Sequence, residues 1–364
     1  MPKLNMNKPS STKTIILSGG GTLGSVMPLL ALADDLRADY NLVFVGTANG
    51  VEKDFVSEAG LPFFSLAAGK WRRYWSWRNL TDLFLFVVGL VQGWLILKKV
   101  KPSLVISAGS FVSVPLAVAA WCRRIPILIH QLDYVPGLAN KLMSPLARRV
   151  TVSLKKSLKD YGHKAVWVGS PVRRRLLMSK AGPTIVAKRF GLTAGMPVIL
   201  VLGGGTGAVG LNRLITDNLY NLTQLAQIIH LTGAGKEINL DHSSAYHQFA
   251  VLSQPEMVLA YQAADLIISR AGMSTLAELA WLGKAAVIIP MPDSHQEANA
   301  KVLAEAKAAL VLNQKKLSSL ELYHKIKELL ADEAKRQSLG ENLRQVFKPN
   351  ANEELVKIIR ELTV

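Results

Sequence analysis

The sequence predicts an α/β protein built from two doubly wound, parallel-sheet domains. Its length of 364 residues exceeds what one hydrophobic core usually serves, which indicates two domains. Short apolar strands alternate with helical stretches, a pattern typical of a parallel sheet, and this alternation begins twice. Hydrophobic residues make up 49% of the chain, which excludes a disordered protein despite a formal net charge of +17. The single cysteine, Cys122, excludes a disulfide framework and a cysteine-based metal site.

In the first half, an apolar strand at 14–17 enters a glycine-rich turn, and a helix follows over about 28–36. A second strand is expected at 41–45. Later strands are expected at 103–107, at 126–129, and near Val150 and Val166.

The pattern restarts with a strand at 197–202, again followed by a glycine-rich turn and a helix. The two domains are expected to join near 170–175, and the chain past about 318 is charged and helical. Further strands are expected at 226–231, 266–269, 286–289 and 309–312.

Both glycine turns resemble the dinucleotide-binding fingerprint, in which backbone N–H groups at a helix N-terminus face an anion. The first reads Gly19-x-Gly21-x-x-Gly24 and the second Gly203-x-Gly205-x-x-Ala208. A nicotinamide enzyme also needs an acid at the end of the next strand, and the strands end in Val45-Gly46-Thr47 and Leu231-Thr232-Gly233. This absence disfavours a nicotinamide or flavin enzyme, and it leaves the alternative that the glycines serve only tight turns.

A carboxylate at a different helix start offers another way to hold a ribose. Gly272 and Ser274 lie where a helix begins, and Glu278 follows four residues after Ser274 on the same face. A helix N-terminus for phosphate with a carboxylate one turn inside suits a nucleoside diphosphate. The alternative is an ordinary capped helix with a solvated Glu278.

These segments together resemble the MurG family of bacterial peptidoglycan N-acetylglucosaminyltransferases, in glycosyltransferase family 28. The resemblance runs from about 14 to 360 and includes both glycine loops, Gly169–Arg173, Arg270–Glu278 and Gln296-x-x-Asn299. It implies a GT-B fold, in which two Rossmann-like domains face each other across a cleft. The expected acceptor and membrane-docking domain is 1–171 with 345–364 packed back on it, and the UDP-sugar domain is 172–344.

The resemblance implies a donor site for UDP-N-acetylglucosamine. It assigns Glu278 to the ribose, the segment 273–277 to the diphosphate and uridine, and Arg173 to a phosphate; Gln254 falls at uracil and Gln296 at the sugar hydroxyls. The implied donor set is Thr22, Leu23, Gly24, Asp133, Arg173, Gly205, Gln254, Arg270, Gly272, Met273, Ser274, Thr275, Leu276, Ala277, Glu278, His295, Gln296 and Asn299.

The resemblance also implies an acceptor site for a diphosphate-linked lipid. Two glycine-containing loops of the first domain are assigned to it: Gly19, Gly20 and Gly21, and Gly109, Ser110 and Phe111.

Two departures from the family pattern concern the catalytic base. The histidine of the first loop is Ser25 here and a neighbouring glycine is Leu23, while the family's His-Glu-Gln-Asn becomes His130-Gln-Leu-Asp133. Inverting transfer needs a base for the acceptor hydroxyl, and serine alone is a poor base at neutral pH. The catalytic candidates are therefore Asp133, His130 and Ser25, with a purely structural His130 as the alternative. No metal or cofactor is expected, because helix N-termini and Arg173 can stabilise the leaving group.

The positive charge is concentrated in the first half of the chain. Residues 1–175 hold 24 Lys+Arg and 9 Asp+Glu, a net charge of +15, against +2 for the remainder. The apolar stretch 83–97 is shorter than the roughly 20 residues of a spanning helix. Before it lies an aromatic and basic cluster expected at a membrane interface: Trp71, Arg72, Arg73, Trp75, Trp77 and Arg78. The alternative is that the aromatic side chains stack on the bases of single-stranded nucleic acid. It is disfavoured because nucleic-acid binding would not explain the adjoining apolar stretch.

The leading hypothesis is transfer of N-acetylglucosamine from UDP-N-acetylglucosamine to the C4 hydroxyl of the muramyl sugar of lipid I, an undecaprenyl-diphosphate-linked muramyl peptide. The product is lipid II. A GT-B transferase with another lipid acceptor and a catalytically impaired UDP-sugar-binding protein are the alternatives. The N-terminus lacks the apolar core of a signal peptide, so we expect a peripheral protein on the cytoplasmic face of an anionic membrane, with no nucleic-acid partner.

Overall fold

The structure is a computed structural model that describes residues 12–69, 78–205, 207–238 and 244–364. It divides into two compact units. Unit 1 comprises the residues up to Val172 together with Lys348–Val364, and unit 2 comprises Arg173–Phe347. The boundaries expected from the sequence were 171/172 and 344/345.

Unit 1 contains a seven-stranded parallel sheet in the order β3-β2-β1-β4-β5-β6-β7. The central strands are runs of apolar residues that are buried on both faces. This is typical of parallel sheets, because helices cover both of their faces. The order reverses between β1 and β4, since β1 pairs with β2 on one side and with β4 on the other. The strands are β1 (Thr14–Ser18), β2 (Asn41–Gly46), β3 (Phe63–Ser65), β4 (Leu104–Ser107), β5 (Ile127–Gln131), β6 (Arg149–Val152) and β7 (Ala165–Trp167).

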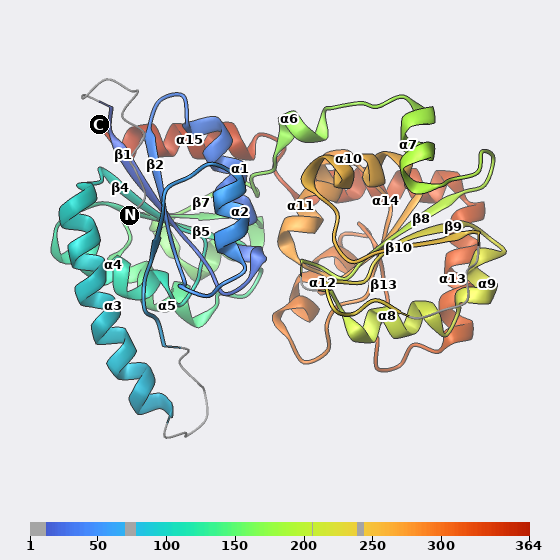
Figure 1. The fold of residues 1–364 in the computed structure, drawn as a ribbon, viewed down its shortest axis with the longest axis horizontal. Helices are drawn as coiled ribbons and strands as arrows, with labels where there is room; N and C mark the ends of the chain where they lie inside the picture. Colours follow the sequence, from blue (N-terminus) through green and yellow to red (C-terminus); the bar gives the residue numbers. More distant parts are fainter. Residues whose placement is uncertain (1–11, 70–77, 206, 239–243) are drawn as a thin grey trace. The chain divides into compact units, whose positions relative to one another are not determined.

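Helices cover both faces of this sheet. Side chains of α3, α4 and α5 join one buried cluster with the strands, and α1 lies beside the C-terminal helix α15 on the other face (Figure 1). The α-helices are α1 (Met27–Leu36), α2 (Glu52–Glu58), α3 (Arg78–Val100), α4 (Ser113–Cys122), α5 (Leu138–Met143) and α15 (Ala351–Leu362). Short 3-10 helices are η1 (Leu23–Ser25), η2 (Ser144–Leu146), η3 (Lys155–Asp160) and η4 (Gly162–Lys164).

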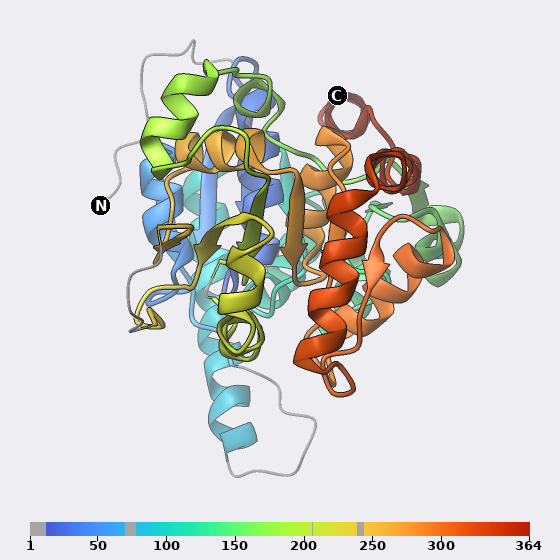
Figure 2. The same ribbon diagram turned by 90° about the vertical axis from the view of Figure 1, so that its right-hand side faces the viewer.

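The helix α3 is longer than the sequence analysis expected. Its segment Thr81–Val100 has 20 residues with a mean hydropathy of 1.8, so the expectation of a stretch below spanning length is wrong. Polar and close contacts nevertheless hold α3 in unit 1. Gln92 Oε1 accepts a hydrogen bond from the Ala67 N–H at 2.7 Å, and a Cβ on Gly89 would lie 2.1 Å from the Ala67 carbonyl oxygen. The N-terminal end of α3 projects beyond the sheet in Figure 1 and Figure 2.

Unit 2 contains a six-stranded parallel sheet in the order β10-β9-β8-β11-β12-β13. One face packs against α8, α9 and α13 through a buried apolar cluster, and α10, α11 and α14 lie on the other. Its strands are β8 (Val198–Leu202), β9 (Gln227–Leu231), β10 (Tyr246–Phe249), β11 (Leu266–Ser269), β12 (Ala286–Ile288) and β13 (Leu310–Val311). Its helices are α6 (Arg174–Leu177), α7 (Pro183–Phe190), α8 (Val209–Thr216), α9 (Leu219–Thr223), α10 (Gln254–Ala263), α11 (Met273–Leu282), α12 (His295–Glu305), α13 (Ser319–Ala331) and α14 (Glu333–Val346).

The sequence analysis missed the two edge strands β3 and β10. Both are short and lie only partly buried, and the mixed residues of β10 (Tyr246–Phe249) do not form an apolar run. Both unit sheets otherwise have the doubly wound parallel order that the alternating pattern predicts.

Candidate active site

The loop after β1 is shaped by the buried hydroxyl of Ser25. Its Oγ accepts a hydrogen bond from the Gly20 N–H at 3.3 Å and can donate to the carbonyl of Gly20 or of Thr22, at 3.5 and 3.4 Å. Ser25 is 6% exposed, whereas Thr22 and Gly24 in the same loop are exposed. These contacts argue against Ser25 as the base, because its hydroxyl is engaged by the loop itself.

The loop accommodates Leu23 in place of a glycine without backbone strain. In the described part of the chain, positive φ angles at residues other than glycine occur only at Lys101, Arg124, Asp293 and Lys307. Leu23 is half-buried at the start of η1. The left-handed position of the loop is Gly21, at φ +78°.

A buried carboxylate that the sequence analysis did not select supports the same loop. Glu52, the first residue of α2, is 0% exposed. Its Oε1 accepts hydrogen bonds from the N–H and Oγ1 of Thr47 at 2.8 and 2.5 Å, and its Oε2 accepts one from the Gly21 N–H at 3.3 Å. A Cβ on Gly20 would lie 2.3 Å from Oε1, so a larger residue there would displace the carboxylate from its present position. The sequence feature that could have indicated Glu52 is its position shortly after the strand expected at 41–45, where the strand's carboxyl end meets the glycine loop.

The loop after β4 meets the loop after β1. Ser110 Oγ donates a hydrogen bond to the Gly20 carbonyl at 2.8 Å. Gly109 has φ +88°, and a Cβ there would lie 2.9 Å from the Asn140 amide. Because the strand order reverses between β1 and β4, this edge is where ligands bind in such sheets. The structure therefore brings the two proposed acceptor segments together, with the Phe111 side chain packed against the core.

The first residue of the next motif, His130, is enclosed within the sheet. It is 2% exposed on β5, with Nδ1 3.0 Å from Thr151 Oγ1 and Nε2 3.3 Å from Ser153 Oγ. Burial lowers the pKa of His130 to about 3, so the ring is neutral at physiological pH. A base must reach the acceptor hydroxyl, and both ring nitrogens already have partners. The assignment of His130 as a catalytic base is therefore corrected to a structural role.

Gln131 organises the loop that carries Asp133. Its Oε1 accepts hydrogen bonds from Asn140 Nδ2 at 2.6 Å and from the Tyr161 hydroxyl at 2.7 Å. Its Nε2 donates to the Asp133 carbonyl at 2.6 Å. Asp133 is half-buried just after β5 and is the remaining ionisable side chain of the motif.

In unit 2, the N-terminus of α11 follows the end of β11. Gly272 is its N-cap, and a glycine has no side chain with which to cap the helix. β11 pairs with β8, and the strand order reverses between them. Met273, Leu276 and Ala277 are buried in the core, whereas Ser274 and Thr275 are half-buried. The first turn therefore offers backbone N–H groups to an anion.

One turn inside α11, Glu278 accepts a hydrogen bond from the buried Tyr261 hydroxyl at 2.6 Å. Burial raises the pKa of Glu278 to about 6, opposed by this hydrogen bond and by the charge of Arg173. Glu278 is half-buried and bonded to Tyr261, so it is not the fully solvated carboxylate that the sequence analysis kept as the alternative. Tyr261 itself was missed, because nothing in its sequence context distinguishes it from a core residue.

A buried arginine and two amides fix the neighbouring loops. Arg270 is 6% exposed and its Nη1 donates to the carbonyls of Ile289 and Pro290 at 2.9 and 3.1 Å. Asn299 is 1% exposed and its Nδ2 donates to the Ala271 carbonyl at 3.1 Å. Both were expected to contact the donor, and their burial instead makes them supports of the loop before α11. Gln296 Oε1 accepts from the Met291 N–H at 3.1 Å, and His295 is exposed.

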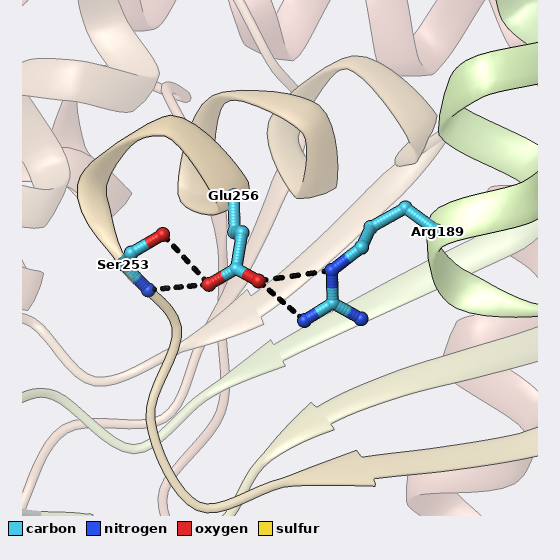
Figure 3. Close-up of polar contacts among 3 residues, drawn as sticks. All are labelled: Arg189, Ser253 and Glu256. Carbon is cyan, nitrogen blue, oxygen red and sulfur yellow. Dashed lines mark hydrogen bonds and ion pairs between the residues drawn. The ribbon is translucent and has the colours of Figure 1, made fainter.

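The start of α10, which carries Gln254, is fixed by a capping box and an ion pair (Figure 3). Glu256 Oε2 accepts hydrogen bonds from the N–H and Oγ of Ser253 at 2.8 and 2.7 Å, and Oε1 lies 2.5 Å from Arg189 Nη2. The hydrogen bonds from Ser253 and then Arg189 lower the pKa of Glu256 to about 2. Arg189 also lies over the Phe249 ring, 5.0 Å from its centroid. Gln254 is half-buried at this fixed helix start.

The second glycine loop approaches the end of β9 closely. A Cβ on Gly207 would lie 2.1 Å from the Thr232 carbonyl oxygen, so only glycine fits there. Gly205 is exposed on this loop. The loop precedes α8 at the same edge of the sheet as the α11 N-terminus.

Comparison with protein families decides the assignment of the chain. The model of the glycosyltransferase family 28 N-terminal domain matches residues 15–152, and that of the family 28 C-terminal domain matches residues 198–355. The chain belongs to glycosyltransferase family 28.

Two family 28 relatives carry the name UDP-N-acetylglucosamine--N-acetylmuramyl-(pentapeptide) pyrophosphoryl-undecaprenol N-acetylglucosamine transferase. The protein of Lachnospira eligens is 37% identical over 327 residues, which cover 88% of this chain and 92% of that protein. The protein of Clostridium botulinum (strain 657 / Type Ba4) is 34% identical over 358 residues, which cover 96% and 99%. The family resemblance inferred from the motifs is confirmed.

Solved structures confirm the GT-B fold class expected for family 28. The crystal structure of Acinetobacter baumannii MurG has a TM-score of 0.73 at 25% identity and covers 96% of this chain and 99% of that chain. A UDP-GlcNAc 2-epimerase from Neisseria meningitidis bound to UDP-GlcNAc has a TM-score of 0.67 at 13% identity and shares the fold.

The aromatic and basic cluster before α3 falls largely outside the described residues. Trp71, Arg72, Arg73, Trp75 and Trp77 lie in the segment 70–77, and Arg78 begins α3 with no described side chain. The membrane hypothesis must therefore be argued from other residues.

Proposed function

We propose that this chain is an inverting transferase that moves N-acetylglucosamine from UDP-N-acetylglucosamine to the C4 hydroxyl of the muramyl sugar of lipid I, forming lipid II. The names of its family 28 relatives support this substrate pair. The observation that carries the donor half is the N-terminus of α11, which begins at a glycine and has Glu278 one turn inside.

Each part of a UDP-sugar has a chemical match in unit 2. The N–H groups at the start of α11 suit the diphosphate, because a helix N-terminus favours negative charge. Glu278 can accept hydrogen bonds from both ribose hydroxyls. Gln254 lies at the fixed start of α10, where it can meet the uracil, and Gln296 can meet the sugar hydroxyls.

The transfer is a single displacement in which the bonds balance. The acceptor C4 oxygen attacks the anomeric carbon, the bond from that carbon to the β-phosphate oxygen breaks, and its electron pair leaves with UDP. The charge that develops on UDP is stabilised by the α11 N-terminus and by Arg173. The anomeric configuration inverts because attack and departure occur on opposite faces.

Asp133 is the proposed base that takes the proton of the acceptor hydroxyl. It is the remaining ionisable group of its motif, since His130 is enclosed and neutral. Gln131 fixes the Asp133 backbone, which limits where the carboxylate can move. The adjoining loops after β1 and β4 suit the acceptor diphosphate because both offer backbone N–H groups.

The lipid acceptor requires access to a membrane, and an exposed apolar face of unit 1 fits an anionic surface. Phe84 is 68% exposed and Leu95 is 58% exposed on α3. The Arg123 guanidinium lies 5.0 Å from the centroid of the Trp94 ring, and the last turn of α3 carries Lys98 and Lys99. Apolar side chains rimmed by cations favour peripheral docking at anionic lipid. This docking face comprises Leu83, Phe84, Leu85, Val87, Val91, Trp94, Leu95 and Trp121.

A transfer assay tests the proposed reaction. The full chain is incubated with labelled UDP-N-acetylglucosamine and a lipid I analogue, and we expect a lipid-linked disaccharide and UDP. Turnover only with another lipid, such as diacylglycerol, would indicate the related transferase. Binding of UDP-N-acetylglucosamine with no turnover on any acceptor would indicate an impaired homologue and overturn the proposal.

Co-sedimentation with vesicles tests the docking face. We expect binding to phosphatidylglycerol-containing vesicles that weakens with salt, and weaker binding after Phe84→Ser with Leu95→Ser. The matched control is Tyr220→Ser, because Tyr220 is 79% exposed in unit 2 and lies outside the docking face. Equal vesicle binding by all three proteins would contradict the role of this face. We also propose that the protein acts at the cytoplasmic side of the membrane, because its nucleotide-sugar donor is supplied there.

A further inference from the structure

A tyrosine hydroxyl deep in unit 2 is committed to the carboxylate of Glu278. Tyr261 is 3% exposed on α10, and its hydroxyl donates to Glu278 Oε2 at 2.6 Å. Burial raises the pKa of Tyr261 well above its usual value, so the hydroxyl keeps its proton and remains a donor. A short bond from a neutral donor to a carboxylate is among the stronger hydrogen bonds in proteins.

Few charged groups surround this carboxylate. On α11 itself, Glu278 is the only charged residue. On α10, Glu256 lies at the opposite end from Tyr261 and is paired with Arg189. On α14, which packs against α11, Arg344 donates to the carbonyl of Leu282 at the far end of α11. Arg173 is the cation whose charge lowers the pKa of Glu278.

The helix that carries Tyr261 is itself tied to the segment that follows Arg173. The neighbouring Gln262 accepts a hydrogen bond from the Ala181 N–H at 3.1 Å through Oε1, and its Nε2 donates to the Ser179 carbonyl. The capping box at the other end of α10 fixes Gln254. One helix therefore connects three parts of the proposed donor site.

We propose that Tyr261 is a positioning residue for donor binding, whose hydroxyl holds Oε2 of Glu278 so that the carboxylate is turned to accept the ribose hydroxyls. This inference rests on the proposed function, in which Glu278 binds the ribose. Tyr261 does not touch the nucleotide: it acts through Glu278, and it opposes protonation of the carboxylate in its apolar surroundings.

The test compares wild-type protein with Tyr261→Phe, using UDP as the probe in calorimetry. We expect UDP to bind about five- to tenfold more weakly to Tyr261→Phe at neutral pH, as the loss of one buried hydrogen bond implies. Because that bond lowers the pKa of Glu278, its removal shifts the acid loss of UDP affinity to higher pH. Raising the pH should therefore recover the part of the loss that protonation causes, whereas the part caused by the misplaced carboxylate should remain. The KM for UDP-N-acetylglucosamine should rise, with little change in kcat at saturating donor.

A second nucleotide and two control variants separate the possible outcomes. We expect wild type to prefer UDP over 2′-deoxy-UDP and Tyr261→Phe to prefer it less, and Tyr261→Phe should have no further effect in a Glu278→Ala background. Tyr246→Phe is the matched control, because it removes another partly buried hydroxyl, bonded to His230 Nδ1 at 2.9 Å.

Equal UDP affinity and pH dependence in wild type and Tyr261→Phe would overturn the positioning role. A loss that is the same at every pH and for both nucleotides would also overturn it, because it would indicate general destabilisation. Failure of wild-type protein to bind UDP would instead overturn the proposed function. The two failures are therefore distinguishable.

Discussion

Replacing Glu278 by glutamine is expected to stabilise the free protein and to weaken its affinity for the donor. Burial raises the pKa of Glu278 from 4.5 to about 6. The folded state therefore binds this proton more tightly than the unfolded chain, and stability falls as pH rises from about 4.5 through 6. At neutral pH the ionised carboxylate costs about 2 kcal/mol of folding free energy.

Glutamine removes this cost and keeps an oxygen for the Tyr261 hydroxyl. Its new N–H groups need partners, so we expect a net gain of about 1 kcal/mol, which is a rise in Tm of about 2–4 °C for a unit of this size. The gain should be present above pH 7 and absent near pH 4, where wild-type Glu278 is also neutral. UDP affinity should fall by about tenfold or more, because a charged hydrogen-bond acceptor is lost.

Thermal unfolding at pH 4, 6 and 7.5, with calorimetry of UDP binding, measures both effects. Glu341→Gln on α14 is the control, because it neutralises an exposed carboxylate of the same unit. A Tm of Glu278→Gln below that of wild type at pH 7.5 would refute the reasoning. So would a difference in Tm that does not change with pH.

Three further substitutions test other parts of the two units. Asp133→Asn should slow single-turnover transfer by about 100-fold or more while UDP affinity is unchanged, and near-normal rates would remove Asp133 from the mechanism. Glu52→Gln should lower the free energy of unfolding by about 1–3 kcal/mol, because the new amide N–H₂ would face the N–H donors of Thr47 or Gly21. A denaturant titration measures this change. An unchanged unfolding midpoint would count against a role of Glu52 in supporting the loop. Glu256→Gln should lose about 1 kcal/mol of stability at neutral pH. That loss should fade as pH falls from about 4.5 towards 2, since the pKa of Glu256 is lowered to about 2, and a deficit that persists at pH 2 would contradict the ion-pair and capping explanation.

The sequence predicted both sheets because their central strands are continuous apolar runs, and it missed β10 because Tyr246-His-Gln-Phe249 is a partly buried edge strand. It also selected the glycine loops, since a strand, a tight turn and a helix leave a local pattern. Side-chain burial was not available from such patterns. His130 and Asn299 therefore passed as site residues although the fold encloses them.

The sequence analysis missed the residues that support the site, because their contacts join parts of the chain that are far apart in the sequence. Glu52 accepts a hydrogen bond from Gly21, which lies 31 residues away in the sequence, and Tyr261 donates one to Glu278, which lies 17 residues away. No spacing rule links such pairs, because the contacts arise only when separate strands and helices pack. Residues that touch a ligand share local motifs, whereas residues that hold those motifs in place are determined by tertiary packing.

The return of the C-terminal helix to unit 1 has a consequence for the order of folding. Asn352 bonds to both Val172 and Asp35, and α15 buries Leu355 and Ile359 on unit 1. Unit 2 is one unbroken stretch of the chain, so all of its residues are synthesised before α15. Unit 1 begins to form before unit 2 but cannot be completed until after it, because one of its covering helices follows the whole of unit 2 in the chain. A nascent chain that stalls before α15 therefore has an incomplete unit 1 although every residue of unit 2 has been made.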